Sequence, residues 1–219
     1  LNYRITRNKD YLKEIKTNED IYLDRNIIPP IYLDEITQGS IIDGGAFDGD
    51  TVELFIEKLG KARQLDIHCY EAERENCQRM EERLCDWKTH KVSIYKRALW
   101  NSTGELLGFS GAGLSGRIIQ KSEEEGVYSE RIDDHGYDKV SMIKLDIEGA
   151  ERYALEGAGN IIRRDFPVLA ICAYHLQDDL VVLPKIIRRI NYGYKLYLRH
   201  YMYSSGDTVL YAIPDWKSL

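Results

Sequence analysis

Three aspartates crowd a glycine-rich turn that follows a short apolar strand pattern. The strand pattern is Ser40–Asp43, and the turn reads Asp43-Gly44-Gly45-Ala46-Phe47-Asp48-Gly49-Asp50-Thr51. Glu71 ends the next strand pattern, and it stands 71 minus 49, or 22, positions after Gly49. That interval is close to the roughly 20 residues that separate a glycine-rich turn from an acid that binds ribose hydroxyls. The pattern predicts a site for a cofactor that contains a nucleoside.

The charge of this turn indicates which cofactor it suits. A pyrophosphate binds best at a helix N-terminus that carries no acidic side chains. Here Asp43, Asp48 and Asp50 would repel an anion, and the glycines do not have the Gly-x-Gly-x-x-Gly spacing. S-adenosylmethionine carries an ammonium and a sulfonium, so the acidic turn favours it over a dinucleotide. A purely structural interpretation stays open, in which Asp43-Gly44 is a strand-ending turn and Asp50 is a helix N-cap.

The strand pattern Met142–Ile147 carries charge on one face. Side chains alternate along a strand, so Lys144, Asp146 and Glu148 point to the same side. A central parallel strand is normally apolar on both faces. Buried charges are tolerated only when they pair or open into a cleft. We therefore expect a functional constellation here, with an edge strand that has a wet face as the alternative.

His175 follows the strand pattern Val168–Ala173, again at a carboxyl end. In an open α/β sheet, ligands bind beyond the carboxyl ends of the strands. A neutral imidazole is well suited to accept a proton near pH 7. We take His175 as the first candidate for a general base and Glu148 as the second. Lys144 and Asp146 would hold the constellation, with Asp146 also near the cofactor.

The remaining sequence indicates a globular α/β protein. Apolar residues make up 43% and charged residues 30% of the 219 residues, which excludes a disordered chain. The net charge of -6 weighs against a broad nucleic-acid surface. No signal peptide or membrane span is visible, so we expect a cytoplasmic protein. The four cysteines have no zinc spacing, and we expect buried free thiols and no metal site, although carboxylates at strand ends could hold a magnesium ion.

Strand and helix patterns alternate from Gly39 onward, which predicts βαβ units and a mostly parallel sheet. The chain closes with a predicted antiparallel hairpin, Lys195–Tyr201 and Thr208–Ile213. Residues 1–38 are taken as an N-terminal helical appendage, with short helical pieces at Tyr11–Ile15 and Ile21–Leu23, and residues 39–219 as the main domain. Residues 101–138 have a weak pattern and are interpreted as a surface loop or a lid. Within them, we expect Gly108–Gly116 to be mobile and to become ordered on ligand binding.

Three sequence segments resemble those of one known protein family. They are Asp43–Thr51, Tyr70-Glu71-Ala72 and Lys144-Leu145-Asp146-Ile147-Glu148-Gly149-Ala150-Glu151, of which the last is the most specific. They resemble the FkbM family of S-adenosylmethionine-dependent methyltransferases, and the resemblance covers roughly Ser40–Ile213.

The resemblance implies a Rossmann-like class I methyltransferase fold, with a seven-stranded sheet that has one antiparallel strand. It implies methyl transfer, usually to a hydroxyl oxygen of a sugar or another natural product. By resemblance, Asp43, Gly45 and Thr51 belong to the cofactor loop and Glu71 binds the ribose. To the same cofactor site we assign Gly44, Ala46, Phe47, Asp50, Ala72, Ala98 and Asp146. Two positions depart from many members of the family: Phe47 stands in place of Asn, and Ala173-Tyr174-His175 in place of a segment with Glu.

The sequence thus predicts a methyltransferase that acts on a small-molecule or glycan acceptor, with no nucleic-acid partner. Two alternatives stay open. One is a nucleotide-dependent oxidoreductase on the same fold. The other is a non-catalytic, cofactor-binding module of a larger glycan-modifying protein.

Overall fold

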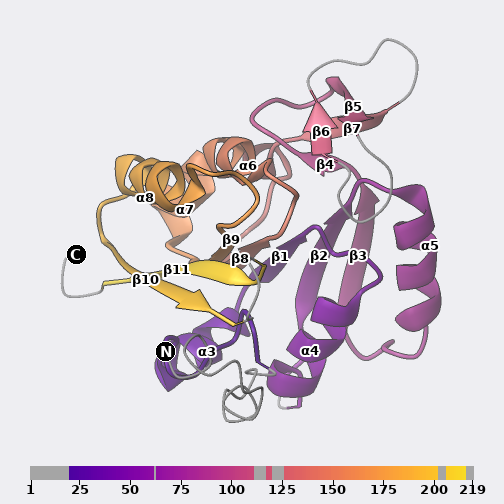
Figure 1. Ribbon diagram of the computed structural model, residues 1–219. Helices are drawn as coiled ribbons and strands as arrows, with labels where there is room; N and C mark the ends of the chain where they lie inside the picture. The colour runs from indigo at the N-terminus through magenta and orange to yellow at the C-terminus, as the bar shows by residue number, and fades with distance from the viewer. Residues whose placement is uncertain (1–19, 62, 111–116, 120–125, 202–205, 216–219) are drawn as a thin grey trace, which may run out of the picture.

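A seven-stranded sheet forms the centre of the computed structural model, which describes residues 20–61, 63–110, 117–119, 126–201 and 206–215 (Figure 1). The strand order is β10-β11-β9-β8-β1-β2-β3. In chain order these strands are β1 (Ser40–Gly44), β2 (Asp66–Glu71), β3 (Lys91–Lys96), β8 (Val140–Leu145), β9 (Val168–Cys172), β10 (Tyr194–His200) and β11 (Thr208–Pro214). Strands β9, β8, β1, β2 and β3 lie side by side in that order and pair in parallel. Strand β11 is antiparallel to both of its neighbours. The predicted fold class is therefore confirmed.

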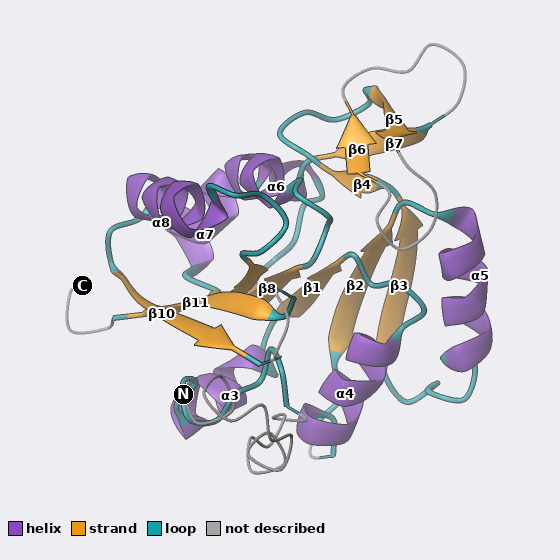
Figure 2. Ribbon diagram, in the orientation of Figure 1, coloured by secondary structure: helices purple, strands orange, loops and turns teal. Residues whose placement is uncertain are grey.

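Helices cover both faces of this sheet (Figure 2). One face packs against α3 (Pro30–Ile36), α4 (Asp50–Leu59) and α5 (Arg74–Arg83), and the other against α6 (Glu151–Gly157), α7 (Gly159–Asp165) and α8 (Asp179–Ile190). Neighbouring strand residues enter opposite cores: Ile41 packs on the α4 side and Ile42 on the α8 side. This alternation places Asp43 and Lys144 on the α4 side, in register with each other on adjacent strands.

Helix α4 begins one residue earlier than expected. Gly49 is the N-cap, with φ of 90° in the left-handed region, and Asp50 is the first helical residue. A Cβ at Gly49 would lie 2.9 Å from Cγ of Met80, so the absence of a side chain lets α5 approach this turn. The buried stripe Val52, Phe55 and Ile56 follows the predicted helical period.

The second half of the chain differs from expectation in two places. The alternation predicts one helix between the strand patterns Met142–Ile147 and Val168–Ala173, and the structure has two, α6 and α7, with Ala158 between them. Strand β8 ends at Leu145, so Asp146 and Glu148 lie in the following loop, where Glu148 has φ of 55°. Because β8 pairs with β1 and β9, it is a central strand, and the alternative of an edge strand is wrong.

Residues 98–130 contain a small second sheet, which the weak sequence pattern did not predict. Its strands are β4 (Ala98–Leu99), β5 (Leu106–Ser110), β6 (Arg117–Ile119) and β7 (Val127–Glu130), in the order β4-β7-β5-β6. A short 3-10 helix, η1 (Ile132–Asp134), follows. The small sheet lies beyond the upper ends of β2 and β3 in Figure 1. Gly108 lies in β5, but most of the segment expected to be mobile, residues 111–116, lies outside the described residues.

Residues 20–38 pack into the same core as the sheet. Tyr22, Leu23 and Ile28 are buried against it together with Ile36 of α3. Tyr22 lies in a turn with φ of 73°, so the short helix expected at Ile21–Leu23 is absent, and the piece expected at residues 11–15 lies outside the described residues. Helix α3 begins at Pro30, where proline's fixed φ favours the first helical turn. The division into an appendage and a domain after residue 38 stays a prediction.

Cys69, Cys77 and Cys172 are buried free thiols, as expected, whereas Cys85 is exposed. Among the described residues, no helix has the length and apolar character that crossing a membrane requires. The cytoplasmic location stays a prediction.

Candidate active site

A cavity of about 650 Å³ opens at the carboxyl ends of β1, β2 and β8. Its lining comes from six segments: Ile21 and Tyr22; Gly45, Phe47, Asp50 and Thr51; Tyr70 to Glu73 with Asn76 and Arg79; Arg97, Ala98 and Leu99; Lys144 with Asp146, Ile147 and Glu148; and Asp207. Eight predicted cofactor residues therefore share one cavity. Asp43, Gly44 and Ala46 are not among the residues that line it.

The glycine turn after β1 is shaped by close backbone contacts. Gly45 has φ of 71°, and its N–H donates to the carbonyl of Tyr70 over 2.9 Å. A Cβ at Gly45 would lie 1.9 Å from the carbonyl oxygen of Asp146, so only glycine fits at this position. The turn therefore lets the loop after β1 lie directly against the loop after β8.

A buried ion pair lies under the turn. Lys144 Nζ is 2.8 Å from Oδ1 of Asp43, and their side chains are 2% and 0% exposed. The same ammonium donates to the carbonyls of Gly45 at 2.7 Å and Gly44 at 3.3 Å. Burial acts to lower the pKa of Lys144, but the charges of Asp43 and Asp146 outweigh it and hold that pKa above its usual range. Lys144 thus has three acceptors within the protein, and it holds the turn in place.

Glu71 is held at the other end of the cavity. Its two carboxylate oxygens accept the N–H groups of Phe47 at 2.9 Å and Glu73 at 2.8 Å. Burial raises the pKa of Glu71, and these two hydrogen bonds oppose the rise. The carboxylate is therefore fixed where β2 ends, beside the turn, as the sequence spacing predicted.

Asp146 is fixed by donors from three directions. Tyr22 Oη donates to Oδ2 over 3.0 Å, and Tyr174 Oη donates to Oδ1 over 3.1 Å. His175 Nε2 lies 3.3 Å from Oδ1. Burial acts to raise the pKa of Asp146, but His175 and the charge of Lys144 hold it well below its usual range. These contacts therefore favour the ionised form of Asp146 in the cavity wall.

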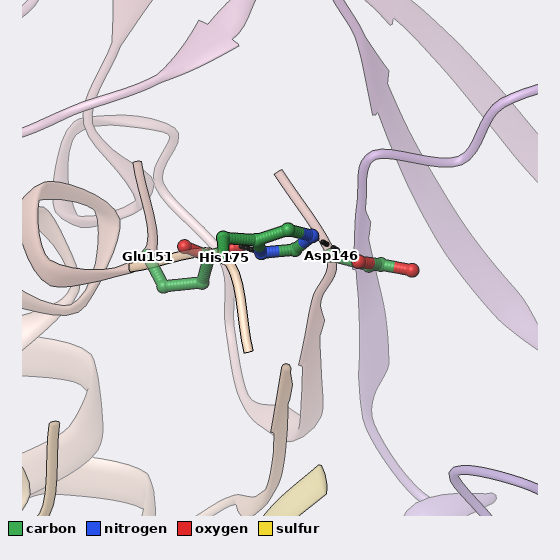
Figure 3. Close-up of side chains that lie close together, drawn as sticks. All are labelled: Asp146, Glu151 and His175. Atoms are coloured by element: carbon green, nitrogen blue, oxygen red, sulfur yellow. Dashed lines mark hydrogen bonds and ion pairs between the residues drawn. The ribbon is translucent and has the colours of Figure 1, made fainter. Parts of the chain in front are cut away.

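His175 lies between Glu151 and Asp146 (Figure 3), and it is not among the residues that line the cavity. Its side chain is 4% exposed, and Nδ1 lies 2.8 Å from Oε1 of the buried Glu151. Burial acts to lower the pKa of His175, but the hydrogen bonds with Asp146 and Glu151 raise it to about 10. The imidazole is therefore protonated at neutral pH, and the premise that a neutral His175 accepts a proton near pH 7 conflicts with this geometry. Glu148, the second candidate, lies on the cavity wall, 3.7 Å from His175 Nε2.

This arrangement predicts a pH dependence of stability. Folding raises the pKa of His175 from 6.5 to about 10, so its contribution is complete below pH 6.5 and is lost as pH rises towards 10. Each pKa unit corresponds to about 1.4 kcal/mol. We expect the free energy of unfolding in urea to fall across this range in the wild type, and to fall less in His175→Gln. Parallel curves for the two proteins would contradict a buried imidazolium.

Asp146, Glu151 and His175 also have the residue types of a metal site. One ligand atom from each lies within 4.8 Å of the others, although the sequence spacing indicated no such site. The three residues come from separate segments of the structure, so their spacing in the sequence did not indicate a metal site. The contacts of both imidazole nitrogens with carboxylates fit a protonated histidine that bridges the two acids and offsets one of their two charges.

Several cavity residues could not be predicted from local sequence signals. Tyr22 enters from the N-terminal segment, and its backbone N–H donates to Tyr211 Oη over 3.0 Å. Arg79 and Arg97 line the cavity from α5 and from the segment before β4. Asp207 enters from the connection between β10 and β11, with φ of 49°. The sequence predicted the hairpin Lys195–Tyr201 and Thr208–Ile213 around Asp207, but not the place of Asp207 in the cavity.

Comparisons with known proteins agree with this architecture. The model of the family described as Methyltransferase FkbM domain matches residues 43–196. No curated protein matches the chain. Among solved structures, an FkbM methyltransferase from Methylobacillus flagellatus has a TM-score of 0.72 and 24% identity, over 96% of this chain and 52% of that one. The chain thus spans about half the length of that relative.

Two more distant structures share the fold. A putative rRNA methylase from Clostridium thermocellum has a TM-score of 0.56 and 7% identity, over 84% of this chain and 90% of that one. Fibrillarin from Aeropyrum pernix, crystallised with natively bound S-adenosyl-L-methionine, has a TM-score of 0.52 and 12% identity, over 89% and 73% of the two chains. The family match, the sheet order and the cavity at the strand ends agree with one another, and the chain belongs to the FkbM family of S-adenosylmethionine-dependent methyltransferases.

Proposed function

We propose that the chain binds S-adenosylmethionine in this cavity and transfers its methyl group to a hydroxyl oxygen of a sugar, a glycan or another natural product. The observation that carries the proposal is the order of three groups along one edge of the sheet. Glu71 follows β2, the Gly45 turn follows β1, and Asp146 follows β8, with β1 between the other two strands. The nucleoside of the cofactor would then lie near Glu71 and its reactive sulfur near Asp146, with Gly45, which has no side chain, between them.

The charge of the cavity fits this cofactor better than a dinucleotide. Asp50 stands in the first turn of α4, where a pyrophosphate would otherwise bind, and Asp146 is ionised on the wall. Both carboxylates favour a cationic ligand. S-adenosylmethionine, when bound, supplies a methyl group on a positively charged sulfur. Glu71 would accept hydrogen bonds from the ribose hydroxyls, with Phe47, Ala72 and Ala98 beside the nucleoside.

The buried charges are proposed to position this machinery. Lys144 and Asp43 hold the Gly45 turn, because the ammonium bonds to the carbonyls of Gly44 and Gly45. His175 holds Asp146 from behind and is in turn held by Glu151. Such positioning accounts for much of the rate of a group transfer, because reacting atoms must align within a few tenths of an ångström.

A labelled-methyl assay tests the proposed function. The chain is incubated with S-adenosylmethionine that carries a tritiated methyl group and with separate pools of neutral monosaccharides, methyl glycosides, phenols and RNA. We expect label in a hydroxyl-bearing small molecule or glycan. RNA is included because one protein of similar fold is described as a putative rRNA methylase. Label only in RNA, or cofactor binding with no label in any pool, would contradict the proposal and support a different acceptor or a non-catalytic module.

Removal of the Glu71 carboxylate is expected to weaken cofactor binding. A hydrogen bond to a charged group contributes about 1.5–3 kcal/mol, so Glu71→Ala should raise the dissociation constant of S-adenosylhomocysteine by about tenfold or more. Glu73→Ala is the control, because it removes a carboxylate from the same wall and leaves the backbone N–H that Glu71 accepts. Equal dissociation constants for the wild type and Glu71→Ala would mean that Glu71 only supports the turn.

A further inference from the structure

Two acidic residues of the cavity, Asp146 and Asp207, differ in the hydrogen-bond donors that surround their carboxylates. Both of the Asp146 oxygens accept hydrogen bonds from tyrosine hydroxyls, and His175 adds a positive charge. Within the part of the chain that the structure describes, no group donates a hydrogen bond to the Asp207 carboxylate. One acid of the pair is thus held as an anion, while the other keeps its acceptor positions open to the cavity.

The backbone around Asp207 is fixed even though its carboxylate is not. Its carbonyl accepts the N–H of Tyr201 over 3.0 Å, and the carbonyl of Thr208 accepts the N–H of Ala173 over 2.8 Å. Asp207 has φ of 49°, in the left-handed region that non-glycine residues rarely adopt. Such strained residues gather at functional sites, where the surrounding structure holds them in place. These backbone hydrogen bonds therefore set the position of Asp207 at the cavity wall.

The charges around Asp207 fit a proton acceptor. Burial raises its pKa, the anion of Asp146 raises it further, and His200 on β10 opposes the rise. Tyr174, whose own pKa is raised by burial and also by the charge of Asp207, is a further titratable neighbour. Asp146 has its pKa shifted in the opposite direction. Two titratable groups whose pKa values are driven apart in one site are the usual arrangement for dividing acid–base roles.

We propose that Asp207 takes the proton from the acceptor hydroxyl during methyl transfer, while Asp146 stays ionised and orients the acceptor. The new bond forms between the acceptor oxygen and the methyl carbon. The carbon–sulfur bond breaks and leaves its electron pair on sulfur. The hydroxyl proton passes to a carboxylate oxygen of Asp207 and later to water. This inference rests on the proposed function, and it assigns the base to Asp207 instead of His175 or Glu148.

Asp207→Asn tests this assignment, because it keeps the volume of the side chain and removes its basicity. Asp34→Asn is the matched control, since it makes the same change on an exposed residue of α3 that does not line the cavity. With the acceptor that takes up label in the assay above, we expect Asp207→Asn to lower kcat by about 10²- to 10⁴-fold. Its affinity for S-adenosylhomocysteine should stay within about twofold of the wild type. Asp34→Asn should keep kcat within a few-fold, and the acid limb of the wild-type pH profile should be absent in Asp207→Asn.

A second measurement does not depend on the acceptor. Carboxyl ¹³C NMR of the full chain with bound S-adenosylhomocysteine should show one aspartate that titrates above the ordinary value of about 3.9 and disappears in Asp207→Asn. That titration should move down in Asp146→Asn.

An ordinary titration of Asp207 would overturn the assignment whatever the acceptor is. Normal turnover of Asp207→Asn on an acceptor that the wild type methylates would overturn it and leave the proposed function intact. Absence of label from every hydroxyl acceptor with the wild type would instead defeat the proposed function itself.

Discussion

Lys144→Met is expected to lower the free energy of unfolding by about 3–5 kcal/mol, because it leaves a buried carboxylate without its counter-ion. Asp43 is fully buried, and the Lys144 ammonium lies 2.8 Å from it. The substitution also removes the donor to the carbonyls of Gly44 and Gly45. Since small domains have a total stability of about 5–15 kcal/mol, this loss should be large and visible in urea unfolding at pH 7.

The double variant Asp43→Asn/Lys144→Met separates the charge from the packing. It removes both charges and keeps similar volumes, so it should be more stable than Lys144→Met alone. The expected order of stability is the wild type, the double variant and then Lys144→Met. A Lys144→Met protein within about 1 kcal/mol of the wild type, or a double variant below it, would show that Asp43 is not ionised in the folded protein.

Gly45→Ala is expected to abolish measurable binding of S-adenosylhomocysteine. The new Cβ would lie 1.9 Å from the carbonyl oxygen of Asp146, so the turn and the loop after β8 must separate. Overpacking of this kind costs about 1–3 kcal/mol, and the left-handed φ of 71° adds about 1–2 kcal/mol. Asp146 and the turn would then no longer face the same ligand, and calorimetry should record no heat of binding.

Gly104→Ala is the control for backbone strain. Gly104 has φ of 86°, yet nothing lies within 4 Å of the position that its Cβ would take. It should lose about 1–2 kcal/mol of stability and keep full affinity for the cofactor. Equal binding losses in the two variants would mean that general destabilisation, and not the contact with Asp146, explains the effect at Gly45.

The sequence predicted the parts of this site that depend on local patterns. The turn Asp43–Thr51 and Glu71 were found from glycine spacing and strand period, and both border one cavity. The charged face of the strand pattern Met142–Ile147 was expected to pair or to open into a cleft, and both occur: Lys144 pairs with Asp43, and Asp146 lines the cavity.

The sequence could not predict contacts between distant segments. The Tyr22 hydroxyl reaches Asp146 across 124 positions, and no local pattern marks it. The protonation of His175 depends on Glu151, which lies in the first turn of α6. The alternation of side chains along a strand cannot predict a contact with a residue of a helix. The small sheet was missed because strands such as β4, of two residues, and β6, of three, are too short to show alternation.

The edge formed by Glu71, the Gly45 turn and Asp146 is expected to bind S-adenosylmethionine. Isothermal calorimetry of the full chain with S-adenosylhomocysteine and, separately, with NAD tests it most directly. We predict saturable binding of one S-adenosylhomocysteine per chain, weakened in Glu71→Ala, abolished in Gly45→Ala and unchanged in Gly104→Ala, with no heat from NAD. Saturable binding of NAD, or S-adenosylhomocysteine affinity that Gly45→Ala and Glu71→Ala leave unchanged, would contradict it.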